Sequence, residues 1–343
     1  MPADARWNTL DGKPPLVIAH RGASGHRPEH TLASYALAIE MGVDYIEPDL
    51  VSTRDGHLIA RHEPLLDETT DVAARPEFAA RRMTRVLDGR SVTGYFACDF
   101  TLQEIKQLRA VQPNAARSKA YDRQYEIPTF EEILDLLEEP LGAGRKIGVY
   151  PETKHPSFHL QLGLELEDRL LQALQAHDLD RADAPVFIQS FESANLQYLR
   201  TRSRVPLVQL LGPEGLEMES GGPGARLTIP QFADPRGGTP PRRLRDMALY
   251  ANAIGPWKRM ILRDTGQPSL SPTNLVEQAH EAGLQVHAYT FRDEPATLAA
   301  VYEADPVREY MQFFELGLDG VFSDFPDTAL RARARYHARP VRG

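Results

Sequence analysis

Short apolar runs alternate with longer segments of helical period along most of this 343-residue chain. Such alternation predicts a parallel β-sheet whose strands are joined by helical crossovers. Because the runs are continuously apolar, we expect the strands to be buried on both faces. The candidate strands are 16–19, 45–50, 57–60, 146–150, 186–189, 206–211, 253–255, 285–289 and 320–323. The candidate helices are 31–41, 129–138, 162–177, 193–201, 244–251, 273–282 and 305–316.

An eight-stranded α/β barrel of the TIM type fits this order, since such barrels occupy about 250 residues as one domain. Nine candidate strands are one too many, and the excess lies within Glu47–Glu63. Two runs there are joined only by Ser52–Gly56, which is too short for a helix and contains the hairpin-turn signal Asp55-Gly56. A turn at those two residues would place Asp49 opposite His62 across an antiparallel pair. We therefore predict a distorted TIM-type (β/α)8 barrel in which one of these strands is an irregularity.

Two segments interrupt the alternation. Residues 64–127 are rich in Arg, Asp and Pro and weak in period, and we interpret them as an insertion that caps one end of the barrel. Residues 212–241 hold seven Gly and six Pro, which predicts an irregular loop. The whole chain, 1–343, is otherwise expected to form a single barrel domain. Much of any ligand pocket at the capped end would then be built by the insertion and the loops.

Charge and composition narrow the classes of partner. Lys and Arg number 39 against 48 Asp and Glu, which gives a net charge of −9, and no basic run is present. An acidic chain of this kind is a poor candidate for binding nucleic acid or an anionic membrane. The sequence has no stretch of 18 apolar residues, so we expect no membrane-spanning helix. The single cysteine, Cys98, excludes an internal disulfide and a cysteine-rich zinc site.

The first residues, Met1–Pro14, are polar and lack the apolar segment of a signal peptide. We therefore expect a cytoplasmic protein, or a periplasmic or secreted one if the numbering begins after a removed signal. The sequence gives no indication of the oligomeric state.

Two carboxylates share one face of the second apolar run. Glu47 and Asp49 are two residues apart, so both point to the same side of a strand. Inside a parallel barrel, unpaired buried carboxylates are very costly, and a hard divalent cation such as Ca²⁺ or Mg²⁺ removes that cost. The alternative is a rim position where both groups are solvated. Glu152, just beyond the fourth candidate strand, supplies a third oxygen ligand.

Histidines and basic residues stand near neighbouring strand ends. His20 and Arg21 follow the first strand, at the end where barrel enzymes carry their active sites. His62 ends the hairpin partner, and Lys154 shares one face of an extended segment with Glu152. Each is ordinary by itself: a satisfied histidine near a turn, or a surface ion pair. Together, three carboxylates, two histidines and two cations indicate metal-assisted phosphodiester cleavage.

Motifs of three other enzyme classes are absent from the sequence. It contains no Walker loop of the form GxxxxGK[ST], no GxGxxG dinucleotide fingerprint and no GxSxG elbow. Kinase-like, dehydrogenase and serine-hydrolase functions therefore have no support.

Several stretches, in chain order, resemble the glycerophosphodiester phosphodiesterase family, in particular its bacterial periplasmic, calcium-dependent type. They are His20-Arg21-Gly22-Ala23-Ser24-Gly25, Pro28-Glu29-His30-Thr31, Glu47-x-Asp49, His62-Glu63, Tyr150-Pro151-Glu152-x-Lys154, Tyr289-Thr290-x-Arg292 and Ser323-Asp324-Phe325-Pro326-Asp327. Two stretches of the insertion, Asp71-Val72-Ala73 and Asp99-Phe100-Thr101-Leu102, are similar to that type. The resemblance spans about residues 15–330.

The resemblance implies a distorted TIM barrel that hydrolyses glycerophosphodiesters, such as glycerophosphocholine, to sn-glycerol 3-phosphate and an alcohol. It also implies one divalent cation, with Ca²⁺ favoured over Mg²⁺, and a small-molecule substrate without nucleic acid or stable membrane insertion. By motif position, His20 and His62 are the acid–base pair, Arg21 and Lys154 contact phosphate, and Glu47, Asp49 and Glu152 bind the metal.

One residue, Glu63, departs from the family pattern, and a second, Pro48, bears on the predicted strand. The family usually has His-Asp where this chain has His62-Glu63, and activity would be weaker if that acid positions the histidine. Pro48 cannot donate a ladder hydrogen bond, which fits an irregular strand. Two other functions remain open: a related phospholipase D-like or phosphoinositide-cleaving barrel, and an inactive barrel that only binds a ligand.

Overall fold

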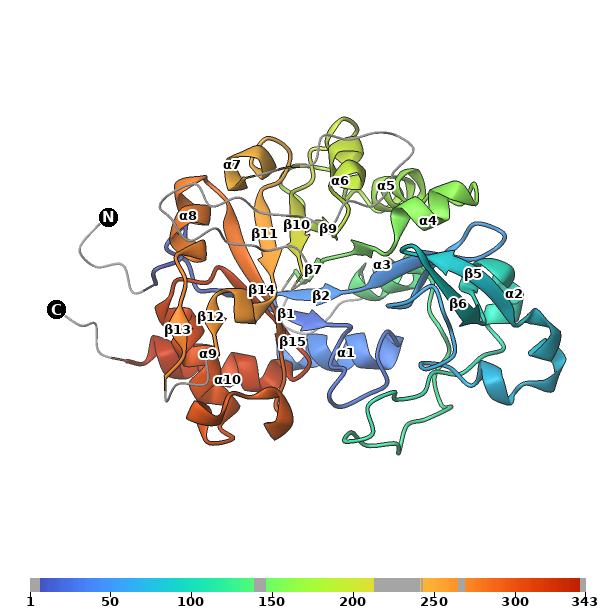
Figure 1. The fold of residues 1–343 in the computed structure, drawn as a ribbon, viewed down its shortest axis with the longest axis horizontal. Helices are drawn as coiled ribbons and strands as arrows, with labels where there is room; N and C mark the ends of the chain where they lie inside the picture. Colours follow the sequence, from blue (N-terminus) through green and yellow to red (C-terminus); the bar gives the residue numbers. More distant parts are fainter. Residues whose placement is uncertain (1–6, 139–145, 213–240, 242, 265–268, 340–343) are drawn as a thin grey trace.

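The computed structural model describes residues 7–138, 146–212, 241, 243–264 and 269–339, and a barrel of parallel strands stands at its centre (Figure 1). Each barrel position is followed in the chain by one or more helices, so the predicted TIM-type fold class is confirmed. The barrel strands are β1 (Leu16–His20), β2 (Tyr45–Glu47) continued by β3 (Asp49–Ser52), β7 (Gly148–Val149) continued by β8 (Glu152–Thr153), β9 (Ile188–Ser190), β10 (Leu207–Leu211), β11 (Ala253–Pro256), β14 (Gln285–Phe291) and β15 (Gly320–Ser323). The strands outside the barrel are β4 (Leu58–Ala60), β5 (Met83–Leu87), β6 (Arg90–Gly94), β12 (Leu262–Arg263) and β13 (Ser271–Pro272).

Two barrel strands are interrupted, and the interruptions cause the distortion. Pro48 separates β2 from β3, and Pro151 lies between β7 and β8. Because proline has no N–H, neither residue donates to the ladder. β2 pairs with β7, and β3 pairs with β8. The hydrogen-bond ladder between these two barrel positions is therefore interrupted at the two prolines, while the chain of each interrupted strand continues across the break. The N–H of Glu152 donates to the carbonyl of Pro48 at 2.9 Å and continues the contact across the break.

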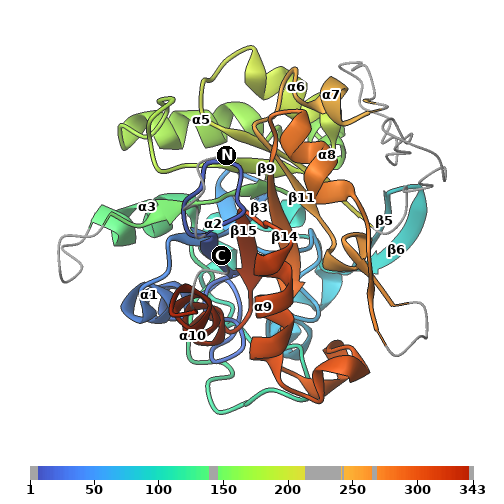
Figure 2. The same ribbon diagram turned by 90° about the vertical axis from the view of Figure 1, so that its left-hand side faces the viewer.

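The helices surround the barrel, as Figure 2 shows for α1, α5, α6, α8, α9 and α10. They are α1 (Leu32–Met41), α2 (Leu102–Ile105), α3 (Phe130–Glu138), α4 (Pro156–Gln161), α5 (Glu167–Ala176), α6 (Ser193–Arg200), α7 (Leu244–Met247), α8 (Leu275–Glu281), α9 (Pro306–Glu315) and α10 (Pro326–His337). No helix in the described ranges is long and apolar enough to cross a membrane.

Five of the seven predicted helices agree with the structure to within two residues at each end. The helix predicted over 162–177 begins only at Glu167, as α5, and α4 ends at Gln161, just before the predicted start. Gly163 adopts a left-handed conformation with φ of 68° just after α4 ends, which breaks the helical ladder. The helix predicted over 244–251 is one turn, α7. The loop predicted over 212–241 lies almost wholly outside the described residues.

The ninth candidate strand is β4, which runs antiparallel to β3 and is not a barrel strand. The predicted register of this hairpin was wrong by one residue. Arg61, not His62, lies opposite Asp49, and its N–H donates to the Asp49 carbonyl at 2.9 Å. The loop holds three residues, 54–56, rather than two, and Gly56 completes it with a φ of 86°. His62 therefore lies one residue beyond the pair formed by Asp49 and Arg61.

The apolar core is divided into separate clusters, and polar groups occupy the carboxyl ends of the barrel strands. One apolar cluster lies within the barrel, and a larger one lies between the strands and their helices. The cluster within the barrel consists of Ile18, Tyr150, Phe187, Val208, Ala253 and Phe322. Polar residues are concentrated above this layer, where the strands end.

Residues 64–127, called the insertion from here on, lie beyond the carboxyl end of β3 and contain β5, β6 and α2 (Figure 1). The insertion forms an apolar cluster with the β3–β4 hairpin. Its members include Val51, Ile59, Leu66, Val72, Phe78, Phe100 and Leu108. The insertion is therefore anchored to the hairpin that carries His62.

Candidate active site

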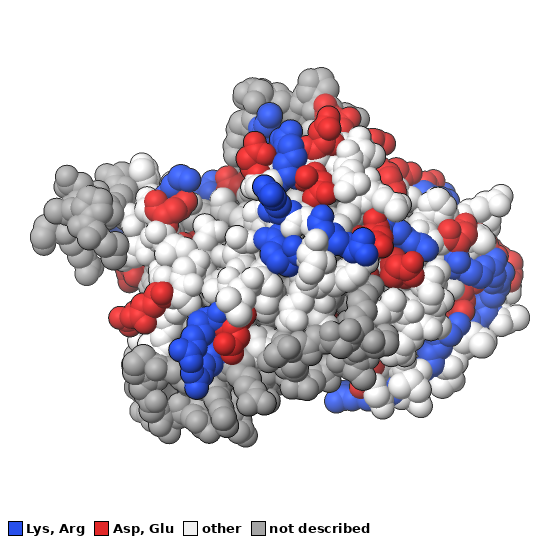
Figure 3. Space-filling view, turned by 90° about the horizontal axis from the view of Figure 1, so that it is seen from above, with Lys and Arg blue, Asp and Glu red and all other residues white. Residues whose placement is uncertain are grey.

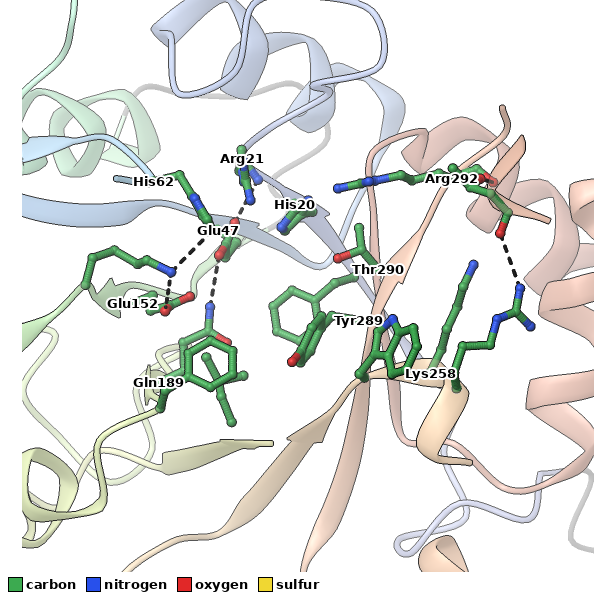
Figure 4. Close-up of a pocket in the computed structure, with 17 residues that line it drawn as sticks. His20, Arg21, Glu47, His62, Glu152, Gln189, Lys258, Tyr289, Thr290 and Arg292 are labelled. Atoms are coloured by element: carbon green, nitrogen blue, oxygen red, sulfur yellow. Dashed lines mark hydrogen bonds and ion pairs between the residues drawn. The ribbon is translucent and has the colours of Figure 1, made fainter. Parts of the chain in front are cut away.

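A cavity of about 400 Å³ opens at the carboxyl ends of the barrel strands. Six of the seven predicted site residues line it: His20, Arg21, Glu47, His62, Glu152 and Lys154. In Figure 4, His62, Glu47 and His20 lie along one edge of the cavity, and Glu152 lies beside them. No described lining residue comes from the insertion, so the expectation that the insertion builds much of the pocket was wrong. Residues on or just after β9, β10, β11 and β14 complete it instead.

Glu47, Asp49 and Glu152 form a buried carboxylate cluster at one side of the cavity. Each offers one oxygen, and these atoms all lie within 4.8 Å of one another. The residues are only 1%, 0% and 5% exposed, so the alternative of a solvated rim does not hold. Strand register produces the cluster, because Asp49 pairs with Glu152 in the neighbouring strand.

Neighbouring groups hold the cluster in place. Glu47 accepts hydrogen bonds from the backbone N–H of Arg21 at 2.7 Å and from Nε2 of Gln189 at 3.0 Å. Oδ2 of Asp49 lies 2.8 Å from Nε2 of the fully buried His30. Oδ1 of Asp49 is buried and has no hydrogen-bond partner among the described residues. A buried acceptor of this kind is costly unless something else binds it.

The electrostatics of the cluster favour a cation. Burial and then the charges of Asp49 and Glu152 raise the pKa of Glu47 above its ordinary range. Burial also raises the pKa of Glu152 to about 8, although Lys154 opposes the shift from 2.9 Å. Burial would raise the pKa of Asp49 too, but His30 holds it below its ordinary value. Three oxygen donors that are costly to ionise together are a suitable ligand set for a hard divalent cation.

His20 is held by a buried acid. Its Nδ1 lies 2.5 Å from Oδ1 of Asp324, which follows β15, the strand next to β1. Asp324 is also bound by Nη2 of Arg117 at 2.5 Å and by Nε of Arg292 at 2.9 Å. Burial and the charge of Arg21 lower the pKa of His20, against the raising effect of Asp324. The ring is therefore oriented through Nδ1, and its Nε2 is left for chemistry in the cavity.

His62 is held by the acid that follows it in the chain. Its Nδ1 lies 2.8 Å from Oε1 of Glu63, and its Nε2 lies 3.3 Å from Nζ of Lys154. A carboxylate at Nδ1 and an ammonium at Nε2 both favour the neutral tautomer that carries its proton on Nδ1. Desolvation in the pocket, followed by the charges of Arg21 and Lys154, lowers the pKa of His62. His62 therefore presents a proton acceptor to the cavity.

Arg21 and Lys154 bring positive charge to the same edge. Nη1 of Arg21 contacts both carboxylate oxygens of Glu29 at 3.0 and 3.1 Å, and its Nε lies 3.5 Å from Asp49. Lys154 lies between Glu152 and His62. Both side chains line the cavity, where an anionic group would meet them.

The opposite wall of the cavity is basic and aromatic. Lys258 and Arg259 share the buried carboxylate of Glu309, at 2.7 and 3.4 Å, and Arg292 also lines the cavity. The aromatic lining consists of Phe191, Trp257, Tyr289 and Phe322. Figure 4 shows Lys258 and Tyr289 on the side away from Glu152. No motif of the sequence pointed to Lys258 or Arg259.

Sequence reasoning missed several residues that hold the predicted ones. His30 and Asp324 lie within the family-like stretches, but no role was assigned to either. Gln189 stands at the end of an apolar run and also had no assigned role. A polar residue directly after an apolar run was the available signal. Arg117 had no signal, because its contact with Asp324 depends on how the insertion folds over 207 residues of sequence separation.

The surface in Figure 3 shows Lys and Arg side chains interspersed with Asp and Glu. A group of neighbouring Lys and Arg side chains lies near the middle of this face, with Asp and Glu side chains at its border.

Comparison with known proteins gives one consistent result. A sequence model of the Glycerophosphoryl diester phosphodiesterase family matches residues 20–328. The chain is 35% identical to glycerophosphodiester phosphodiesterase GDPD6 of Arabidopsis thaliana, over 95% of this chain and 88% of that protein. It is 31% identical to a glycerophosphodiester phosphodiesterase of Haemophilus influenzae, over 94% and 91% of the two chains.

Solved structures show the same fold. An Oleispira antarctica phosphodiesterase in complex with the product sn-glycerol-3-phosphate matches with a TM-score of 0.60 at 23% identity, over 94% of this chain and 98% of that one. A glycerophosphodiester phosphodiesterase from Agrobacterium tumefaciens matches with a TM-score of 0.56 at 20% identity, over 92% and 99%.

Proposed function

The chain belongs to the glycerophosphoryl diester phosphodiesterase family and is a phosphoric diester hydrolase, and we propose that it hydrolyses water-soluble glycerophosphodiesters to sn-glycerol 3-phosphate and an alcohol. One observation carries this proposal. A cluster of three buried carboxylates, of which Glu47 and Glu152 line the cavity, meets two histidines paired with carboxylates at a single cavity of about 400 Å³. All the groups that metal-assisted diester cleavage requires are therefore in reach of one substrate.

Glu47, Asp49 and Glu152 are the residues that would hold a divalent cation. Their oxygens are buried and close together, and Oδ1 of Asp49 has no partner within the described residues. When bound, such a cation supplies charge stabilisation for the phosphoryl oxygens as phosphorus is attacked. An all-oxygen donor set suits Ca²⁺ and Mg²⁺, and the resemblance to the calcium-dependent type favours Ca²⁺.

His20 and His62 are assigned to proton transfer. One imidazole takes a proton at Nε2 from the water that attacks phosphorus. As the bond from phosphorus to the alcohol oxygen breaks, the other imidazole gives a proton to that oxygen. The lowered pKa of each ring keeps it neutral, as the base must be. The negative charge of a bound diester raises the pKa of the ring that must act as the acid.

Arg21 and Lys154 are assigned to the phosphate group. Both line the cavity beside the carboxylates, and both carry charge that the diester's single negative charge would attract. The basic and aromatic wall around Lys258 would then face the alcohol that leaves. A diester of a neutral alcohol should therefore be assayed alongside the choline diester.

The test is release of sn-glycerol 3-phosphate by protein stripped with EDTA, with Ca²⁺ or Mg²⁺ added back. Glycerophosphocholine and glycerophosphoglycerol are used in parallel. We expect activity only after metal is restored, and the more effective cation identifies the cofactor. Equal turnover by the stripped protein would overturn the assignment of the carboxylates to a metal. No turnover of either diester with either cation would overturn the proposed reaction and favour an inactive, ligand-binding barrel.

A second substrate form separates the lipid-cleaving alternative. Vesicles of intact phosphatidylcholine are presented under the same conditions, and choline release is measured. We expect release from glycerophosphocholine and none from the vesicles. Cleavage of vesicles alone would favour the phospholipase D-like function instead.

A further inference from the structure

We propose that His155 is a positioning residue for His62, acting through Glu63 and held in turn by Asp88 of the insertion. The inference rests on the proposed function, in which His62 transfers a proton. It assigns to the insertion, which lines no part of the cavity within the described residues, a second contact with the site beside that of Arg117 with Asp324. It also gives a reason for the one residue in which the chain departs from the family pattern.

The four side chains form a continuous row of alternating imidazoles and carboxylates. Oε1 of Glu63 lies 2.8 Å from Nδ1 of His62, and its Oε2 lies 3.5 Å from Nε2 of His155. Nδ1 of His155 lies 3.1 Å from Oδ2 of Asp88. Each inner member therefore contacts two partners, one on either side.

The length of Glu63 allows it to bridge two rings. Its two oxygens are divided, one to each histidine. An aspartate at this position would draw the carboxylate back by one C–C bond, about 1.5 Å. It could then reach His62 only by giving up His155. The glutamate in place of the usual aspartate is thus matched to a histidine at 155.

His155 is held in an unusual conformation where it can make both contacts. It precedes α4 with φ of 45° and ψ of 52°, in the left-handed region. Histidine tolerates this region better than most side chains, but the conformation is still unfavourable. Two carboxylate partners raise the pKa of His155 to about 9 against the effect of burial. A protonated ring donates from both nitrogens, which is what two carboxylates require.

The apolar packing of the insertion places Asp88 at this point. Asp88 and Gly89 form the turn between β5 and β6, with φ of 51° and 74°. Next to the turn, Leu87 packs in a small cluster that joins the insertion to Phe158 of α4. The cluster also includes Phe96 and Cys98. The hairpin tip is thereby fixed against the helix that His155 begins.

The consequence for His62 is a fixed tautomer and a fixed ring direction. Glu63 is 47% exposed at its side chain, and by itself it would be free to turn toward water. His155 restrains the second oxygen, so the first stays on Nδ1 of His62. Nε2 of His62 then remains directed at Lys154 and the cavity.

The test uses His155→Asn, Glu63→Asp and the double variant, with saturating metal. Asparagine tolerates the left-handed backbone but is too short to reach both acids. We expect His155→Asn to lower kcat roughly fivefold with KM unchanged, because phosphate and metal groups are untouched. Glu63→Asp should cost about threefold in the parent and nothing further in the double variant.

A second readout needs no turnover. In protein labelled with ¹⁵N-histidine, the ring shifts of His62 should report the Nδ1–H tautomer in the parent and a mixture of tautomers in His155→Asn. His177→Asn is the matched control, because His177 also pairs with an acid, Glu138 at 2.7 Å, but lies away from the cavity. Parent-like kcat together with an unchanged His62 tautomer in His155→Asn would overturn the inference. A parent that cleaves no diester would instead overturn the proposed function, and the tautomer would still test the row of contacts.

Discussion

The two candidate acid–base histidines are supported by different parts of the molecule. His20 ends β1, and its partner Asp324 follows the neighbouring β15; their side chains are 10% and 3% exposed. His62 follows the β3–β4 hairpin, and its partner Glu63 is the next residue; their side chains are 31% and 47% exposed. Barrel closure therefore brings one pair together, and Arg117 of the insertion also holds it, whereas a surface hairpin and the Asp88 turn of the insertion support the other.

The difference teaches how much support each histidine needs. A buried pair interacts in a medium of low dielectric constant, whereas an exposed pair is screened and loses entropy when it is ordered. Asp324 is further fixed by Arg117 and Arg292, so His20 has a rigid partner. Glu63 becomes comparably ordered only through its second contact, with His155. Substitution of the acid that supports His20 should therefore lower kcat and stability more than substitution of the acid that supports His62.

The largest effects should come from removing the rings themselves. His20→Ala and His62→Ala should each lower kcat by about 10² to 10⁴, because each loses one of two proton transfers. Steady-state release of sn-glycerol 3-phosphate measures the loss. His26→Ala is the matched control, since His26 pairs with Asp327 at 3.0 Å and does not line the cavity. Parent-like kcat in either test variant would remove that histidine from the mechanism.

The strands and the paired carboxylates could be predicted because they are local properties of the chain. Continuous apolar runs identified the barrel strands, and the two-residue spacing of Glu47 and Asp49 placed both on one face. The hairpin register could not be read, because Asp55-Gly56 fits a two-residue turn as well as the three-residue loop that forms. The break at Gly163 had a signal, the glycine itself, but the leucines around it continue the helical period.

The supports of the two histidines could not be predicted, because they join distant parts of the chain. Arg117 and Asp324 are 207 residues apart, and only the folded insertion brings them together. His155 and Asp88 are 67 residues apart and meet because apolar residues dock a hairpin on α4. Periodicity carries no information about such contacts.

The next effect sharpens the comparison between the two acids. Burial would raise the pKa of Asp324, but His20, Arg117 and Arg292 hold it well below its ordinary value. Asp324→Asn should lower kcat by about 10² to 10³, because His20 loses its orienting charge. It should also destabilise the fold by roughly 3 kcal/mol, because the buried guanidinium group of Arg117 and the buried ring of His20 both lose a charged partner.

Glu63→Gln is the matched variant at the other histidine. Its loss in kcat should be about tenfold, since amide oxygen still accepts from Nδ1 and the site is partly screened. Thermal unfolding should be close to that of the parent. Equal losses in kcat and equal unfolding temperatures for Asp324→Asn and Glu63→Gln would show that burial does not distinguish the two supports.

The smallest effect concerns the pH dependence of stability at His155. Its ring faces Asp88 and Glu63, with Lys154 and His159 also nearby, and the two acids raise its pKa to about 9. A raised histidine pKa means that the charged form stabilises the fold, fully below about pH 6.5 and progressively less as pH rises through 9. Parent and His155→Asn should therefore differ by roughly 2 °C in unfolding temperature near pH 6.5 and converge above pH 9. Groups that titrate alike in both proteins cancel in this difference, so a gap that stays constant with pH would contradict a charged His155 between the two acids.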